Sequence, residues 1–166
     1  MKYLYKITFI CLFLAFNSMA SEVDELIPQA KVDHFIELAF SQKSSTYTEY
    51  AVLFNFCQQR AEHADCKKPF EEAESRYKVA EANHKVLLMV ANTDMKSLEM
   101  PVAGEQELTS LLAEQDYVDE EVAHTSALVN ALNLWLEDNQ MPQTDKVYFL
   151  HSLMVKVDSA HQKQAQ

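Results

Sequence analysis

The sequence predicts an all-α fold, a single-domain bundle of five to six mostly antiparallel helices with one disulfide. Glycine occurs once, at Gly104, and four prolines divide the chain into pieces of helical length. Within these pieces apolar residues recur at three- and four-residue spacing, and no segment rich in β-branched residues alternates with the period of two typical of strands. Short connections between such helices favour antiparallel neighbours.

Residues 1–20 have the layout of a secretory signal peptide. Lys2 and Lys6 precede an apolar run, and a small residue, Ala20, ends the segment. The run is well under the roughly 20 apolar residues that a membrane-spanning helix needs, although an uncleaved anchor is the alternative. We therefore expect export to the periplasm, one helical-bundle domain over residues 21–166, and no stable membrane insertion after cleavage.

The charge of the chain limits its partners. Lys and Arg number 14 against 25 Asp and Glu, a net charge of −11, and removal of Lys2 and Lys6 would leave 12 against 25, or −13. An anionic surface excludes nucleic acid and acidic membranes as favoured partners. It is compatible with a basic protein, although an acidic surface also simply keeps a protein soluble.

Six helices are expected in the order of the chain. Their approximate bounds are 29–42, 46–63, 69–93, 105–115, 118–138 and 144–163. Thr46 and Glu49 have the spacing of a capping box, which predicts a new helix at that point. Aromatic residues then occupy more than one side of the second helix (Tyr47, Tyr50, Phe54, Phe56). They indicate either a helix packed between two neighbours or an exposed protein interface.

Cys57 and Cys66 are the two cysteines of the expected mature chain, and an exported protein favours a disulfide between them. Nine helical steps would separate them by about 13.5 Å, whereas a disulfide needs roughly 4.4 to 6.8 Å between Cα atoms. The helix must therefore end between them, and Pro69 suits the first turn of the next. A metal or redox site that adds His63 is the alternative, but it lacks a fourth ligand.

The connection over residues 92–106 has weak helix propensity and contains Met95 and Met100. It is the expected long connection or flap. Methionines in such a segment either form an adaptable binding surface or fill a gap in the core.

Two Glu-x-x-His units, Glu81 with His84 and Glu121 with His124, lie on different predicted helices. Residues three apart share a helix face, and the doubled unit resembles the metal ligands of ferritin-like bundles, which implies a site for iron or manganese. The two further carboxylates of that family have no clear counterpart. The acids beside Glu121 are equally explained by the first turn of a helix, where negative charge is favoured. We otherwise predict no cofactor.

Catalytic patterns are absent from the sequence. There is no Gly-x-Ser-x-Gly motif, and the mature cysteines are expected to be oxidised. His151 projects onto an apolar helix face, where we expect a core histidine with hydrogen-bond partners. The sequence therefore predicts a non-enzymatic protein.

Three functions remain open. The first is an exported protein-binding module of the bacterial envelope, of the inhibitor or immunity type or a chaperone or assembly accessory, because an acidic surface can steer a basic partner. The second is a helical metal protein that uses Glu81, His84, Glu121 and His124. The third is a structural component that oligomerises through one of its helices.

Overall fold

The computed structural model describes residues 26–92, 94–118 and 125–165. The expected signal peptide therefore lies outside the described residues. The helices are α2 (Gln29–Gln59), α3 (Lys68–Ala91), α4 (Val102–Ala113), α5 (Thr125–Asp138) and α6 (Phe149–Ala165), with short 3-10 turns η1 (Ala64–Cys66) and η2 (Asp94–Ser97). Within the described residues the sole β-type pairing is one bridge between Glu99 and Tyr148. The all-α prediction is confirmed.

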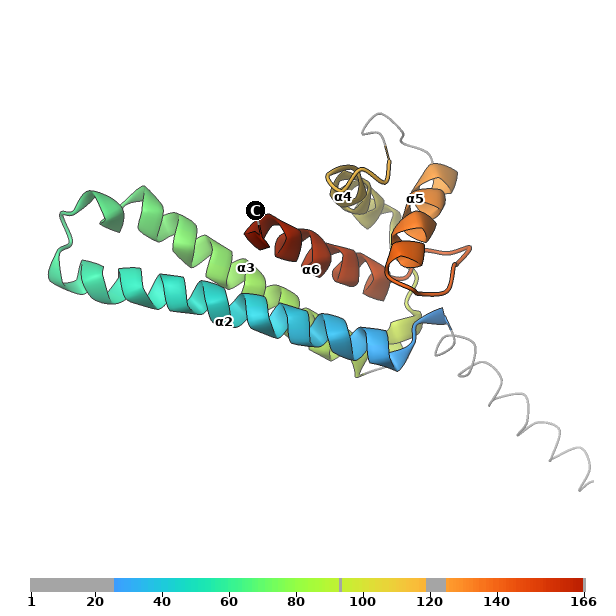
Figure 1. The fold of residues 1–166 in the computed structure, drawn as a ribbon, viewed down its shortest axis with the longest axis horizontal. Coiled ribbons are helices and arrows are strands. Elements are labelled where there is room, and N and C mark those ends of the chain that lie inside the picture. The colour runs from blue at the N-terminus through green and yellow to red at the C-terminus, as the bar shows by residue number, and fades with distance from the viewer. Residues whose placement is uncertain (1–25, 93, 119–124, 166) are drawn as a thin grey trace, which may run out of the picture.

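A long antiparallel hairpin of α2 and α3 gives the molecule its shape (Figure 1). Helix α6 packs against the part of both helices that is far from the turn, and α4 and α5 lie around α6. The turn end of the hairpin projects beyond this body, and no residue from 47 to 72 is fully buried. The molecule thus consists of a packed body and a projecting arm that is only two helices thick.

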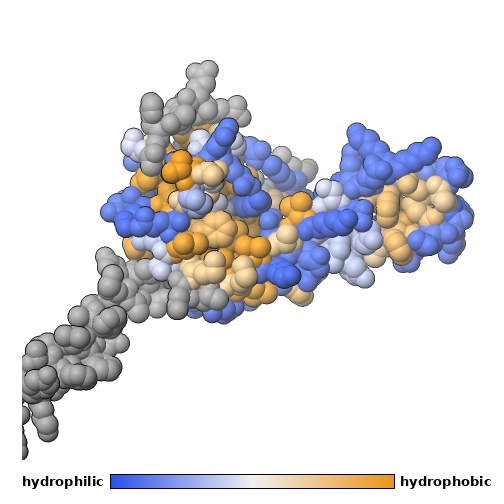
Figure 2. Space-filling view, turned by 180° about the vertical axis from the view of Figure 1, so that it is seen from behind, coloured by the Kyte–Doolittle hydropathy of each residue, from blue (hydrophilic) through white to orange (hydrophobic). Residues whose placement is uncertain are grey.

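The hydrophobic core lies in the body, where α2, α3, α4, α5 and α6 meet. Its largest fully buried side chains include Trp135, Phe35, Leu87, Leu108, Leu132 and Met154. The apolar residues Val147 and Tyr148 before α6, and Leu153, Met154 and Val157 within it, are all buried. On α5, Leu128, Leu132, Trp135 and Leu136 are buried, and Val129 is half-buried. Figure 2 shows that hydrophobic side chains also reach the surface of the body.

The two helices expected over residues 29–42 and 46–63 are one continuous helix, so the prediction of a break was wrong. Thr46 does not cap a helix start, because its hydroxyl donates to the Gln42 carbonyl at 2.8 Å inside α2. Ser44 and Thr48 likewise donate to carbonyls four residues earlier, at 2.9 Å each. Such hydroxyl-to-carbonyl bonds are compatible with a helix but slightly destabilise it, so the packing of the buried Thr46 accounts better for the continuous helix.

The last helix begins at Phe149 and not near residue 144. Thr144 forms a turn in which its backbone N–H donates to the Asn133 side chain at 2.9 Å and its hydroxyl donates to the Lys146 carbonyl at 2.9 Å. The chain then pairs briefly with Glu99 before α6 starts. The predicted first turns of helix 118–138 fall partly on residues outside the described part, and α5 is described from Thr125 onward.

The connection over residues 92–106 is shorter than expected, because η2 and the first turn of α4 occupy parts of it. Met100 packs against the core, as the gap-filling interpretation predicted, and its backbone N–H donates to the Val147 carbonyl at 2.8 Å. Among the described residues, no helix combines the length and apolarity required to cross a membrane.

Candidate functional site

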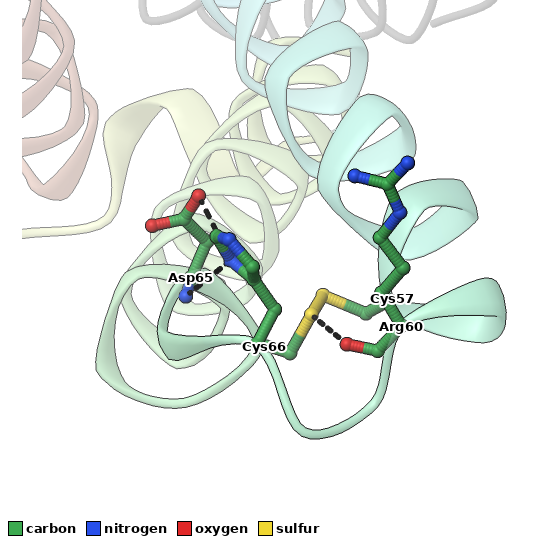
Figure 3. The surroundings of a disulfide bond; sticks show 5 residues. Cys57, Arg60, Asp65 and Cys66 are labelled. Carbon is green, nitrogen blue, oxygen red and sulfur yellow. Dashed lines mark hydrogen bonds and ion pairs between the residues drawn. A yellow bond between two sulfur atoms is a disulfide. The ribbon is translucent and has the colours of Figure 1, made fainter.

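The projecting end of the hairpin is closed by the predicted disulfide (Figure 3). Cys57 in the last turn of α2 is bonded to Cys66 in η1, with 5.4 Å between their Cα atoms. Helix α2 ends between them at Gln59, and Pro69 lies in the first turn of α3, as predicted. With the two sulfurs bonded to each other, the pair supplies no thiolate for the alternative metal site in this form of the protein.

His63 has a local structural role in this turn. Its Nδ1 accepts from the Asp65 backbone N–H at 3.3 Å, which caps η1. Its ring stands edge-on to Phe56, with centroids 5.0 Å apart. The Arg60 guanidinium lies over the same Phe56 ring, 5.2 Å from its centroid. These contacts order the turn around the disulfide.

Three aromatic pairs connect α2 to α3 along one side of the hairpin. Phe40 lies 5.6 Å from His84, Tyr47 lies 5.3 Å from Tyr77, and Phe54 lies 6.5 Å from Phe70, measured between ring centroids. Each step of seven residues along α2 is matched by a step of seven back along α3, which is two turns of either helix. We call these pairs the aromatic ladder; Tyr50 joins it by stacking on Tyr77 at 5.6 Å.

The α2 members of the ladder remain largely open to solvent. Phe40 is 55% exposed, Tyr47 52% and Phe54 40%. Their α3 partners are half-buried beneath them. Large exposed rings in a row are unusual on a surface that contacts only water, and aromatic residues are enriched in protein interfaces.

The α2 side of these rings carries very little charge, whereas the α3 side carries ion pairs such as Lys78 with Glu74. From Ser44 to Gln59 the sole charged residue is Glu49, and its carboxylate forms an ion pair with Arg76 of α3. Solvated helix surfaces normally carry charge at about a quarter to a third of their positions. The composition of this part of α2 is therefore that of a helix face that is covered by protein.

Charge is distributed unevenly over the molecule. Residues 43–81, which form most of the arm, carry 6 Lys and Arg against 7 Asp and Glu. Residues 82–166 carry 5 against 13. The negative charge predicted to steer a partner thus belongs to the body, and the arm is nearly neutral.

The predicted metal residues are described only in part. Glu81 accepts a hydrogen bond from the Tyr77 hydroxyl at 3.1 Å, and His84 lies half-buried against Phe40. Burial, and then the nearby Lys43, lower the pKa of His84, which keeps its imidazole neutral as a ligand requires. Glu121 and His124 lie outside the described residues.

Within the described part of the chain, no three His, Cys, Asp or Glu side chains are grouped as a metal site would require. The described half of the proposed ligand set offers one carboxylate and one imidazole. The metal hypothesis therefore remains a prediction that depends on the segment containing Glu121 and His124.

His151 is a core residue, but the expectation of hydrogen-bond partners was wrong. Its side chain is fully buried, and among the described residues neither ring nitrogen has a hydrogen-bond partner. Its ring stands edge-on to Tyr148 at 5.5 Å between centroids. Burial lowers its pKa from 6.5 to about 4, so the histidine is neutral in the folded protein.

The aromatic ladder was missed in the sequence although its signal is present there. Phe40, Tyr47 and Phe54 follow one another at intervals of seven, as do Phe70, Tyr77 and His84. The predicted break near residue 43 placed Phe40 in a different helix from Tyr47, which hid the repeat.

Comparisons of the chain with protein-family models, curated proteins and solved structures found no match.

Proposed function

We propose that this protein is an exported, non-enzymatic protein-binding module of the bacterial envelope. The observation that carries the proposal is the exposed side of the arm, where the aromatic ladder lies beside a stretch of α2 with one paired charge. Aromatic anchors with few charges around them are the composition of the centre of protein interfaces. Figure 2 is consistent with this, because hydrophobic side chains gather near the end of the arm with hydrophilic residues around them.

An inhibitor or immunity role, or a role as a chaperone or assembly accessory, fits this architecture. A two-helix arm tipped by a disulfide can reach a partner while its rigid body stays outside the contact. The acidic body supports a basic partner, because opposite net charge accelerates encounter. A periplasmic location is part of the proposal and is supported by the layout of residues 1–20 together with the Cys57–Cys66 disulfide.

The test compares two variants of the chain expressed in full and recovered gently from the periplasm. Tyr47→Ala with Phe54→Ala removes two exposed rings, and Val79→Ala removes an exposed side chain of α3 that is not part of the ladder. Native mass spectrometry would measure any bound protein. We expect the double variant to weaken binding roughly 30-fold or more, as loss of interface anchors does, and Val79→Ala to bind like the wild type.

If both variants bind the partner equally well, the aromatic ladder is not part of the binding surface. Recovery of the wild type from cells with no associated chain of any kind, its own included, would contradict the protein-binding role itself.

A further inference from the structure

The pattern of residues beside the aromatic ladder indicates what covers it. Along one side of α2 the residues Phe40, Ser44, Tyr47, Ala51, Phe54 and Gln58 follow at alternating steps of four and three. This is the spacing with which two helices interlock in a coiled coil. All six are exposed except Ala51, which is half-buried, so the row lies on the outside of the hairpin. We call it the α2 seam.

The α2 seam is complementary to itself when a second copy is turned end to end. Large and small side chains alternate along it, and reversal of the helix direction sets each large ring against a smaller side chain. Tyr47 then faces Ala51 of the second copy, Phe54 faces Ser44, and Phe40 faces Gln58. A parallel arrangement would set Tyr47 against Tyr47 and leave Ala51 facing Ala51, with alternating crowding and gaps.

The charges favour the same arrangement. Parallel α2 helices would bring the two acidic bodies side by side, whereas antiparallel helices separate them. The strongly acidic bodies then lie at opposite ends, where their repulsion is screened by distance and salt.

We infer that the α2 seam pairs with the α2 seam of a second copy of this chain, in an antiparallel dimer with two-fold symmetry. The axis passes beside the midpoint between Tyr47 and Ala51, and the paired seams span about 27 Å. Two-fold symmetric pairing through one self-complementary patch is the commonest form of homo-oligomer. This inference rests on the proposed function, since it concerns the same exposed surface, but it names a second copy of the chain instead of a basic protein as the partner of that surface.

The test measures the monomer–dimer equilibrium of the oxidised wild-type protein by sedimentation over a wide range of concentrations. Ala51→Glu places a charge at the centre of the seam with only a small loss of helix propensity. Val52→Glu is the matched control, because the next residue points about 100° away around the helix and is 64% exposed. Circular dichroism would verify that both variants are folded.

We expect a concentration-dependent dimer whose Kd rises at least about tenfold in Ala51→Glu and is unchanged in Val52→Glu. The register gives a second expectation. A mixture of Ala51→Glu with Tyr47→Lys should restore dimers between the two variants, because the introduced carboxylate then faces the introduced ammonium group. Neither variant alone should dimerise as well as the mixture.

Several results would overturn the inference. A wild-type protein that is monomeric at every concentration excludes the dimer. If both glutamate variants weaken dimerisation equally, the α2 seam is not the contact surface. A mixture that stays monomeric excludes the antiparallel register. If the wild type is monomeric alone yet binds another envelope protein through Tyr47 and Phe54, the dimer falls while the proposed function stands. If it binds nothing, both fall.

Discussion

The side-chain amide of Gln42 donates a hydrogen bond to the backbone carbonyl of Val157 at 2.7 Å, across 115 residues of sequence. Gln42 is fully buried in α2 at the point where α6 crosses it. The contact therefore fixes the position of the arm relative to the last helix of the body. It is one of the few polar links inside an apolar core.

Replacement of Gln42 by leucine should test that link. The substitution keeps a similar volume and removes one buried hydrogen bond, so we expect the free energy of unfolding to fall by about 1 to 2 kcal/mol. Ser41→Ala, at the exposed neighbouring position, should change it by less than about 0.5 kcal/mol. Urea unfolding measures both, and an unaffected Gln42→Leu would show that the amide adds nothing to stability.

Removal of the disulfide should loosen the end of the arm. In the chain-entropy model a loop of about ten residues contributes roughly 2.5 to 3 kcal/mol. We expect Cys57→Ser with Cys66→Ser to lower the free energy of unfolding by about 2 to 4 kcal/mol, with the helical content of the folded protein unchanged. Wild-type protein should lose a similar amount on reduction. Equal stability of the oxidised and reduced forms would contradict this expectation.

The buried imidazole of His151 should make stability depend on pH. Burial holds its pKa at about 4 in the folded protein, against 6.5 for an exposed histidine. Below pH 6.5 the unfolded chain binds a proton that the folded chain does not, so stability is complete above pH 6.5. It should fall as the pH drops toward 4, by up to about 3 kcal/mol.

His151→Leu should abolish this loss. The variant also removes two buried nitrogens without partners, so at pH 7 it should be at least as stable as the wild type. Denaturant unfolding of both proteins at intervals from pH 7 to pH 4 gives the comparison. Carboxylates titrate in both, and the difference between the two curves isolates His151. Parallel curves would show that the imidazole does not titrate as its burial implies.

The single tryptophan of the chain reports on another buried contact. Trp135 is fully buried, and its indole Nε1 donates to Asp158 Oδ2 at 2.8 Å. Asp158→Ala leaves the indole N–H without an acceptor and should cost about 1 to 3 kcal/mol. Asp158→Asn keeps an oxygen acceptor and should cost less. Fluorescence of Trp135 during urea unfolding measures both, and equal losses would show that the hydrogen bond is not the source of the cost.

The sequence was informative where local rules agree with tertiary packing. The three- and four-residue spacing of apolar residues predicted helices with one buried side, as in α6. The separation of Cys57 from Cys66 predicted a helix end between them. It misled at Thr46, because the same hydroxyl can cap a new helix or bond inside an existing one. The burial of Thr46 decided between these, and burial is not visible in a run of six polar residues, 41–46.

For the candidate site, the sequence predicted some of the residues but not which residues pair with each other. Tyr47 and Phe54 were recognised as potential interface residues, but their partners Phe70 and Tyr77 on α3 were not. The ladder depends on which residues of α3 stand opposite which residues of α2, and the length of the turn between the helices sets that register. His151 shows the same limit, since sequence placed it in the core but could not show that its neighbours are apolar.

Because the aromatic ladder repeats every seven residues in both helices, the pairing of its rings restricts the lengths that the arm can have. Removal of residues 44–50 together with 74–80 would shorten the arm by about 10.5 Å and leave every remaining ring opposite its partner. A deletion of one residue from each helix would instead turn the disulfide-bonded end by about 100° relative to the body. Variants of this chain with arms of other lengths should therefore differ by whole multiples of seven residues in each helix.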